Sequence, residues 1–468
     1  MVDRDANVAV GPRVPVTDRL PVAFAGHGAG IGELSWGQRE LWGYMQRIDS
    51  WHPIGAVLTL PGDTTVADAV ADLEFAMSNY PSMRTRLLLD PGGLPKQVVA
   101  ASGQTWLEVV DAADDDDPAD VAAAAFNHYR DADYNVVTDW PVRVAVIRHR
   151  GRLTHQAWVM SHLVTDGTGG LVILKELAAR DATGSRQAPT PLEQARWQAS
   201  PAGQRQCAGA LRYWEKALRG LSTNRFPSRV QRPYPRYWQG LFTSRALHLA
   251  ARTIAMRAGA EVSSVLLALF CVALARVTGI NPVAVMTVVS NRFRPGLAET
   301  VSPIMQTGLA VIEVPDATID EVVRYTKRRV MTTYKDAYYD PPQRDALIAR
   351  LGAERGEPLD LTCVFNDRRL KHQAGSGPMA SEQDVLAALA DTNLKWTHKQ
   401  DVHEFEGLGV QLDDVPDTVQ MTITCDIHHV APEDVAATLH GMVELSVAAM
   451  RDPDTRAGVA SAHATVSS

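Results

Sequence analysis

Cysteine is scarce in this sequence, and its four copies are far apart. Cys207, Cys271, Cys363 and Cys425 form no Cys-x-x-Cys pair, which argues against a zinc site and against a disulfide framework. Cys271 and Cys363 lie in apolar runs, so we expect them to be small core residues. Because this cysteine usage is typical of a reducing compartment, we expect a cytoplasmic protein without a structural metal.

Long apolar runs and an excess of basic residues are also missing. No run of about 18 apolar residues is present, so we expect no membrane-spanning helix. Residues 1–18 are polar and lack the apolar centre of a signal peptide, and they are expected to form a disordered arm. The Ala-, Ser- and Thr-rich residues 455–468 are expected to be a disordered tail. The formal net charge of −8 argues against a nucleic-acid binder, which usually carries a basic face.

The chain does have enough apolar residues for a sizeable core. Its 468 residues are 46% hydrophobic and 21% charged, which is typical of a globular protein with two to four domains. Helical and strand patterns alternate, so we expect an α/β fold built of layers. The polar, Pro-containing residues 180–201 are the predicted linker, between an N-terminal lobe over 19–200 and a C-terminal lobe over 201–454. The acidic run 114–117 is expected to be a solvated loop, with an ordered ion site as the alternative.

The spacing of apolar residues predicts the helices and strands. Ser35 is expected to cap the first helix, and another helix is expected to carry Tyr213 and Trp214. Further helices are predicted over 66–77, 119–129, 168–179, 252–258, 262–277, 319–334, 343–351 and 432–450. Strands are predicted over 56–60, 142–146, 153–159, 283–289, 308–314, 359–365 and 419–427, with a hairpin joining 84–89 to 97–99.

A histidine and an aspartate stand between a predicted strand and a predicted helix, in the sequence Ser-His-Leu-Val-Thr-Asp-Gly. The neutral ring of His162 can accept a proton at neutral pH, because the histidine pKa is near 6.5. Asp166 would orient the loop, and the glycines would let the backbone approach a substrate closely; they are Gly167, Gly169 and Gly170. The alternative is that His162 satisfies hydrogen bonds at a strand end and that the glycines form an ordinary tight turn.

This sequence resembles the His-His-x-x-x-Asp-Gly signature of condensation domains in nonribosomal peptide synthetases, with Ser161 in place of the first histidine. Other segments resemble further motifs of that family, in the same order. They are Leu-Ser-Trp-Gly-Gln-Arg-Glu-Leu-Trp at 34–42, Ser-Met-Arg-Thr-Arg-Leu at 82–87, the helix with Tyr213, Trp214 and Leu218, Asn-Arg-Phe-Arg-Pro-Gly-Leu at 291–297, and 301–307. The matches span roughly residues 30 to 450, and the chain is identified as a member of the condensation-domain superfamily.

The resemblance implies two lobes similar to chloramphenicol acetyltransferase, arranged as a V-shaped pseudo-dimer with a central tunnel. His162 would lie in the tunnel, bind the attacking amine or alcohol and accept its proton. Asp166 would pair with Arg292, and Gly167 would leave room for the reacting carbonyl. The implied catalytic residues are therefore His162, Asp166 and Gly167, supported by Ser161 and Arg292. The alternative for Arg292 is a surface arginine in a loop.

The implied reaction transfers an acyl group from a thioester to an amine or alcohol and gives an amide or ester. The thioester would be carried by the phosphopantetheine of an acyl or peptidyl carrier protein, or by coenzyme A, and no covalently bound cofactor is expected. No carrier-domain Gly-Gly-x-Ser motif is visible, and no adenylation, ketosynthase or thioesterase segment fits the length. We therefore expect a free-standing enzyme of natural-product biosynthesis that acts on its carrier protein in trans. Lys327, Arg328 and Arg329 are a candidate docking site for an acidic carrier protein, with a solvated helix face as the alternative.

Departures from the family's motifs leave other functions open. Ser302 and Gln306 replace a glycine and an asparagine of the second-lobe motif, and Pro303 stiffens the chain between them. One alternative is a coenzyme A-dependent acyltransferase of the same fold. Another is a non-catalytic module that recruits a tailoring enzyme to a carrier-bound peptide. The pair His428 and His429 is followed by no Asp-Gly and is interpreted as structural.

Overall fold

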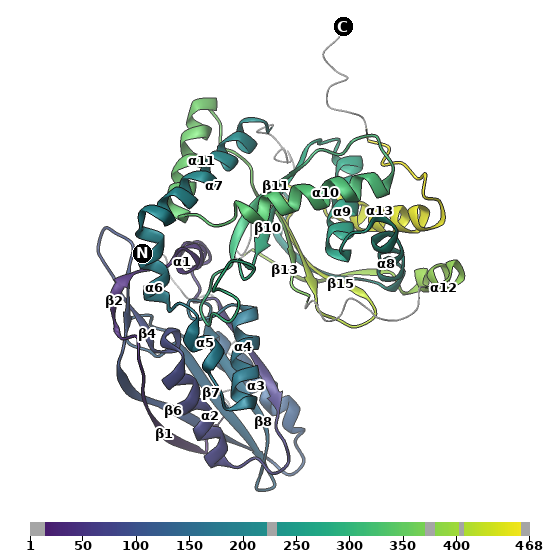
Figure 1. Cartoon of the computed structure of the whole chain (residues 1–468). Helices are drawn as coiled ribbons and strands as arrows, with labels where there is room; N and C mark the ends of the chain where they lie inside the picture. The colour runs from purple at the N-terminus through teal and green to yellow at the C-terminus, as the bar shows by residue number, and fades with distance from the viewer. Residues whose placement is uncertain (1–14, 222–231, 370–379, 402–406, 460–468) are drawn as a thin grey trace. The chain divides into compact units, whose positions relative to one another are not determined.

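The computed structural model describes residues 15–221, 232–369, 380–401 and 407–459 of the chain. These residues belong to two compact units (Figure 1). Unit 1 consists of residues 1–205 and 290–305, and unit 2 of residues 206–289 and 306–468. The predicted lobes were divided at residue 200 and placed 290–305 in the C-terminal lobe. The structure instead groups 290–305 with unit 1, and the contacts responsible are described below.

Unit 1 is built around a five-stranded sheet with the order β1-β6-β7-β8-β3. The strands are β1 (Asp18–Ala25), β6 (Ser102–Ala112), β7 (Val142–His149), β8 (Arg152–Ser161) and β3 (Pro53–Thr59). Only β6 and β7 pair in parallel, because the helix α3 (Pro118–Asp131) connects them as a crossover.

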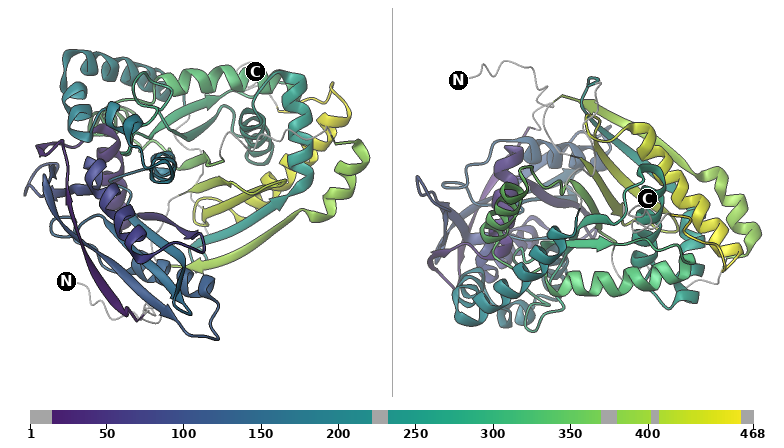
Figure 2. Two further views of the ribbon diagram at one scale, coloured as in Figure 1. Left: turned by 60° about the horizontal axis from the view of Figure 1, so that its bottom comes forward. Right: turned by 90° about the horizontal axis from the view of Figure 1, so that it is seen from above.

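Helices cover both faces of this sheet (Figure 2). On one face α3 packs through Ala122 and Ala125 against Ala145 and Ile147 of β7. The other face packs against α2 (Val66–Asn79) and α4 (Gly167–Ala179). Burial on both faces explains why β7 is continuously apolar and buried over residues 144–147 rather than alternating there.

A smaller three-stranded sheet in unit 1 has the order β2-β5-β4, with β2 (Gly30–Glu33), β5 (Lys96–Val99) and β4 (Thr85–Leu88). The antiparallel pair β4–β5 confirms the predicted hairpin. The helix α1 (Trp36–Ile48) begins with the expected cap, since Ser35 and Gln38 form a reciprocal capping box.

The predicted linker 180–201 is wrong, because it contains the helices α5 (Thr183–Gln187) and α6 (Pro191–Ala199). Thr190 and Glu193 form a capping box at the start of α6, and a proline in the first turn is compatible with a helix. Leu192 and Ala195 are buried by this helix. Its polar residues lie on both sides of the helix, since Glu193 and Arg196 are exposed whereas Gln194 and Gln198 are buried.

Unit 2 contains a seven-stranded sheet with the order β11-β10-β12-β14-β15-β9-β13. The strands are β9 (Tyr237–Ser244), β10 (Val283–Val289), β11 (Gln306–Ile312), β12 (Cys363–Asp367), β13 (Asn393–Gln400), β14 (Leu408–Asp413) and β15 (Val419–Asp426). The helices are α7 (Pro201–Arg219), which enters from unit 1, α8 (Arg245–Ala258), α9 (Val262–Thr278), α10 (Ile319–Lys335), α11 (Pro341–Arg355), α12 (Glu382–Ala387) and α13 (Pro432–Arg451).

The core of unit 2 lies between its sheet and the helices α8, α9, α10 and α13. Helix α9 is buried on all sides, from Ser264 through Ala275, as expected for a helix with apolar residues around its whole circumference. Cys271 and Cys363 both lie in this core, which confirms their prediction as core residues, and all four cysteines are buried and form no disulfide. The mixed α/β class expected from the sequence is confirmed in both units.

The expected disorder at the two ends is wrong where the structure describes them. Asp18 pairs with Val109 at the start of β1. At the other end, Ala457 is fully buried and its carbonyl accepts a hydrogen bond of 2.7 Å from Arg276 Nε. Residues 1–14 and 460–468 lie outside the described residues.

The acidic run 114–117 is exposed, in agreement with the expected solvated loop, and Asp117 caps α3. Among the described helices, none is by itself long and apolar enough to cross a membrane; α8 and α9 meet that length and composition only as a pair bent by 107°.

Candidate active site

The end of strand β8 and the start of helix α4 hold His162 and Asp166 in unit 1. The backbone N–H of Ser161 donates to the Pro141 carbonyl at 2.9 Å, and that of His162 donates to the His52 carbonyl at 3.2 Å. Asp166 is the N-cap of α4, and its Oδ1 accepts a bond of 2.9 Å from the Gly169 N–H. The predicted strand–turn–helix is therefore present, and hydrogen bonds fix its backbone at both ends.

The ring of His162 has a defined tautomer. Its Nδ1 lies 2.9 Å from the carbonyl oxygen of Thr165, and because a carbonyl can only accept, Nδ1 must carry the proton. Nε2 is then the acceptor nitrogen of the neutral ring. Burial lowers the pKa of His162 below its usual value, against the opposing charge of Asp166. The ring is thus neutral at physiological pH and can accept a proton at Nε2.

The carboxylate of Asp166 binds Arg292 and backbone N–H groups rather than the imidazole of His162. Arg292 Nη1 donates to Asp166 Oδ2 at 2.8 Å, and the two side chains are only 8% and 7% exposed. The backbone N–H of Ile304 reaches the same oxygen at 3.3 Å, while Arg292 Nη2 donates to the Thr300 carbonyl at 2.9 Å. The ion pair expected between Asp166 and Arg292 is present, and it excludes the alternative of a surface arginine.

Further hydrogen bonds keep residues 290–305 in unit 1, although β10 and β11 on either side belong to unit 2. Ser82 Oγ donates to the Val301 carbonyl at 2.7 Å, and Gln194 Nε2 donates to Ser302 Oγ at 2.9 Å. The departure at Ser302 therefore has a specific partner in α6. Together with the Arg292 pair, these bonds explain why the boundary of the units differs from the predicted one.

Two of the family-like motifs meet at Gly37 in α1. A Cβ at this position would lie 2.1 Å from the carbonyl oxygen of Pro303, a separation that atoms cannot adopt. Only glycine allows α1 to lie so close to this segment. The motif at 34–42 therefore supports the same loop that presents Arg292.

The glycines after Asp166 differ in their surroundings. A Cβ on Gly169 would lie 2.4 Å from Thr165 Oγ1 and 3.1 Å from Arg292 Nη2. A Cβ on Gly167 or on Gly170 would meet no atom within 4 Å in the described parts of the chain. Gly169 is therefore required by packing around the ion pair, whereas Gly167 borders open space.

We expect Gly167→Ala to change the free energy of unfolding by less than about 1 kcal/mol, because the added methyl group meets nothing. Gly169→Ala is expected to cost roughly 1–3 kcal/mol, because Thr165 or Arg292 must move. Denaturant unfolding of the two variants measures the difference, with Gly170→Ala as the matched control for an open helical glycine. Equal destabilisation at Gly167 and Gly169 would show that the space beside Gly167 is not open.

Ser161, which stands where the family signature has a histidine, is fully buried. Its Oγ accepts only a long bond of 3.4 Å from the Leu163 N–H. We expect Ser161→Ala to cost less than about 1 kcal/mol of stability, and Ser161→His to cost roughly 1–3 kcal/mol through overpacking. Thermal unfolding of both variants tests this, and a stable Ser161→His variant would show that the site still has room for the family's residue.

The other predicted residues lie in unit 2. Lys327 Nζ donates to the Gly259 carbonyl at 2.7 Å and Arg329 Nε to the Val311 carbonyl at 3.4 Å, so Arg328 alone of the three extends into solvent. His428 Nε2 lies 3.0 Å from the Pro233 carbonyl, which agrees with its structural interpretation. His429 Nε2 lies 3.8 Å from Asp426.

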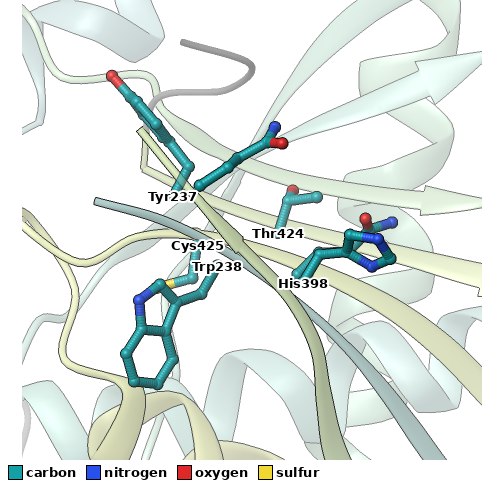
Figure 3. A pocket seen from close by; sticks show the side chains of 7 residues that line it. Tyr237, Trp238, His398, Thr424 and Cys425 are labelled. Atoms are coloured by element: carbon teal, nitrogen blue, oxygen red, sulfur yellow. The ribbon is translucent and has the colours of Figure 1, made fainter. Parts of the chain in front are cut away.

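A small pocket in unit 2 does not include any predicted site residue. It lies across β9, β13 and β15, where the consecutive side chains Tyr237 and Trp238 point in opposite directions (Figure 3). Its lining residues are Tyr237, Trp238, Gln239, His398, Gln400, Thr424 and Cys425.

Sequence reasoning missed one residue of the site, His52. Its ring lies parallel to that of His162, with centroids 5.0 Å apart and an interplanar angle of 9°. His52 comes directly before β3, which pairs with β8, and Pro53 lies opposite Ser161 in that pairing. No local pattern marks this histidine, because only the pairing of the two strands brings it to His162.

A model of the condensation-domain family matches residues 56–367. This match covers more than half of the chain and includes the whole His162 loop and Arg292, so the chain belongs to the condensation-domain family.

Curated relatives include the nonribosomal peptide synthetase TES of Alternaria alternata, 22% identical over 340 residues, and the bassianolide nonribosomal cyclodepsipeptide synthetase of Beauveria bassiana, 24% identical over 349 residues. Each match covers 69% of this chain but only 6% and 11% of the relative, so the chain spans a small part of the proteins it matches.

Solved structures share the fold at low identity. One describes condensation domain-mediated chain release from the enacyloxin polyketide synthase, with a TM-score of 0.69 and 17% identity, covering 98% of this chain and 88% of that one. Another is the complex of the X-domain and OxyB from teicoplanin biosynthesis, with a TM-score of 0.65 and 16% identity, covering 93% and 97%.

Proposed function

We propose that this chain transfers an acyl group from a carrier-protein thioester to an amine or alcohol and so forms an amide or ester in natural-product biosynthesis. The observation that carries this proposal is the neutral ring of His162, with Nδ1 held by Thr165 and Nε2 left as acceptor. The open space beside Gly167, which follows His162 by five residues in the sequence, offers room for a substrate carbonyl.

The reaction follows from this arrangement in two steps. Nε2 of His162 accepts the proton of the attacking N–H or O–H group as the nucleophile bonds to the thioester carbon. The tetrahedral intermediate then expels the pantetheine sulfur, and the proton on Nε2 passes to it, giving a thiol and a neutral histidine. General-base help of this kind is worth roughly 10²- to 10⁴-fold, and alignment of two bound substrates adds to it.

The pair of Asp166 and Arg292 supports this chemistry indirectly. Because the carboxylate is occupied by Arg292, Gly169 and Ile304, it takes no proton in the cycle. It fixes the turn that carries the Thr165 carbonyl, and through that carbonyl it fixes the tautomer of His162.

The test is to incubate the purified full chain with an acyl-loaded carrier protein and candidate amines and alcohols, and to follow the products by mass. A second series replaces the carrier thioester with the matching coenzyme A thioester. Product from the carrier thioester supports the proposal, whereas product from coenzyme A alone favours a diffusible-thioester acyltransferase.

A recruitment role is the second candidate, because the chain shares its fold with the X-domain that was solved in complex with OxyB. A pull-down with a peptidyl carrier protein and a tailoring enzyme from the same gene neighbourhood tests this role. Stable binding of both, with no product in either series, would favour recruitment over acyl transfer.

A further inference from the structure

The rings of His162 and Tyr44 both contact the ring of His52 in unit 1. The His162 ring stacks on it at 5.0 Å and 9°, and the ring of Tyr44 in α1 meets it edge-on, with centroids 4.9 Å apart and an angle of 70°. The His52 carbonyl also accepts the backbone N–H of His162 at 3.2 Å. His52 therefore contacts His162 through both its ring and its backbone.

We propose that His52 is a positioning residue that fixes the ring plane of His162 and keeps that ring neutral. This inference rests on the proposed function, since it assigns a role to His52 within the same site. His52 itself makes no bond to substrate in this scheme, and it acts only through His162.

The stacking contact restricts rotation of the His162 ring. The bond from Nδ1 to the Thr165 carbonyl sets one edge of the ring, but a single hydrogen bond leaves rotation about its axis. A parallel ring against one face removes this freedom. Nε2 is then held in one direction, which matters because a proton acceptor must be aligned with the attacking group.

The stacking contact with His52 also opposes protonation of the His162 ring. The His52 ring covers one face of the His162 ring and keeps water away from it, and loss of water disfavours the charged form of an imidazole. Burial, together with the charge of His162, lowers the pKa of His52 to about 4. Burial lowers the pKa of His162 as well. Both rings are therefore neutral at physiological pH.

The charged groups near His52 and His162 are consistent with both rings being neutral. From the α4 side Asp166 favours the protonated form of His162, but Arg292 pairs with that carboxylate at 2.8 Å. From α1 the guanidinium of Arg47 lies over the Tyr44 ring, 5.8 Å from its centroid. Because Arg292 neutralises the Asp166 carboxylate, this carboxylate stabilises a proton on His162 less than an unpaired carboxylate would.

The backbone of His52 determines which substitutions are informative. Its φ is 47°, in the left-handed region that asparagine tolerates better than most residues. His52→Asn thus removes the ring while keeping the backbone conformation and its carbonyl. His52→Phe keeps a flat ring that can stack but cannot be protonated.

The test is an NMR titration of the full chain labelled with ¹⁵N-histidine, with the His162 signals assigned by their loss in His162→Ala. In the wild type we expect the Nδ1-protonated tautomer and a pKa of His162 below its usual value. In His52→Asn we expect an upward shift of that pKa, because water reaches the exposed ring face, and a mixture of tautomers, because the ring can turn away from the Thr165 carbonyl. In His52→Phe we expect the wild-type tautomer, because the stack is kept.

The matched control is His155→Asn in β8, whose ring contacts Thr154 and not His162. It should leave the His162 signals unchanged. If His52→Asn leaves both the tautomer and the titration of His162 as in the wild type, the proposal is overturned. Should that variant fail to fold, loss of the wild-type tautomer in a folded His52→Phe variant would overturn it equally.

The titration needs no substrate, so it separates this inference from the proposed function. The expected titration in a protein without acyl-transfer activity would refute the function and leave the positioning role intact. Where the protein is active, the acid limb of the kcat/KM profile should move to higher pH in His52→Asn, by the same shift as the pKa of His162. An unmoved limb would count against the role.

Discussion

Replacing His162 with alanine is expected to lower the rate of acyl transfer by roughly 10²-fold or more. The variant loses the Nε2 acceptor, and no other titratable side chain in this loop can replace it, because Asp166 is occupied by Arg292 and two backbone N–H groups. Single-turnover measurements with a preloaded carrier protein report the chemical step directly and separate it from carrier binding.

The stability of the His162→Ala variant should change little. The side chain makes one hydrogen bond to a carbonyl and one ring contact, so its removal is expected to cost about 1 kcal/mol. His155→Ala, in strand β8 that leads to His162, is the matched control and should retain full activity. Equal product from the wild type and His162→Ala would remove the histidine from the mechanism and leave alignment alone to account for the rate.

Helices were the part of the fold that the sequence predicted best, because most of them bury apolar residues that recur at helical spacing along the local sequence. Helices α2, α4, α9, α10 and α13 all lie within a few residues of their predicted limits. Strands were missed where the partner strand and not the local pattern stabilises them. β1 was not predicted, because Pro21 interrupts its short apolar segment, but it is an edge strand, which tolerates proline.

Strands β9 and β13 were also not predictable from their local sequence. β9 pairs with both β13 and β15, which are far away in the sequence, and β13 has polar and charged residues at most of its positions. β9 has no regular alternation of apolar and polar residues, and in β13 the alternation is confined to residues 393–397. Only the assembled sheet of unit 2 gives them their conformation.

The parts of the site whose residues are close together in the sequence could be predicted from local patterns, and the distant residues could not. The turn from β8 to α4 can be recognised in a short stretch of sequence, and so can the N-cap at Asp166. Arg292 was placed beside Asp166 by resemblance to a family, and the structure has that contact. His52 had neither a local pattern nor a family motif, since it reaches His162 through the pairing of β3 with β8.

Asp166→Ala is expected to lower the free energy of unfolding by about 3–5 kcal/mol. The change leaves Arg292 buried without its counter-ion, and an uncompensated buried charge is costly. The N–H groups of Gly169 and Ile304 also lose their acceptor. Denaturant unfolding followed by circular dichroism measures this loss, and low yield of folded protein would be its extreme form.

Two further variants separate the ion pair from the helix cap. Asp117→Ala removes the exposed cap of α3, which forms no ion pair with any described residue, and should cost only about 0.5–2 kcal/mol. Asp166→Asn keeps a good capping side chain but removes the charge, so it should be nearly as unstable as Asp166→Ala. If Asp166→Asn unfolds like the wild type, the contribution of Asp166 is that of a cap alone. The pairing with Arg292 would then hold the loop in place without stabilising the fold.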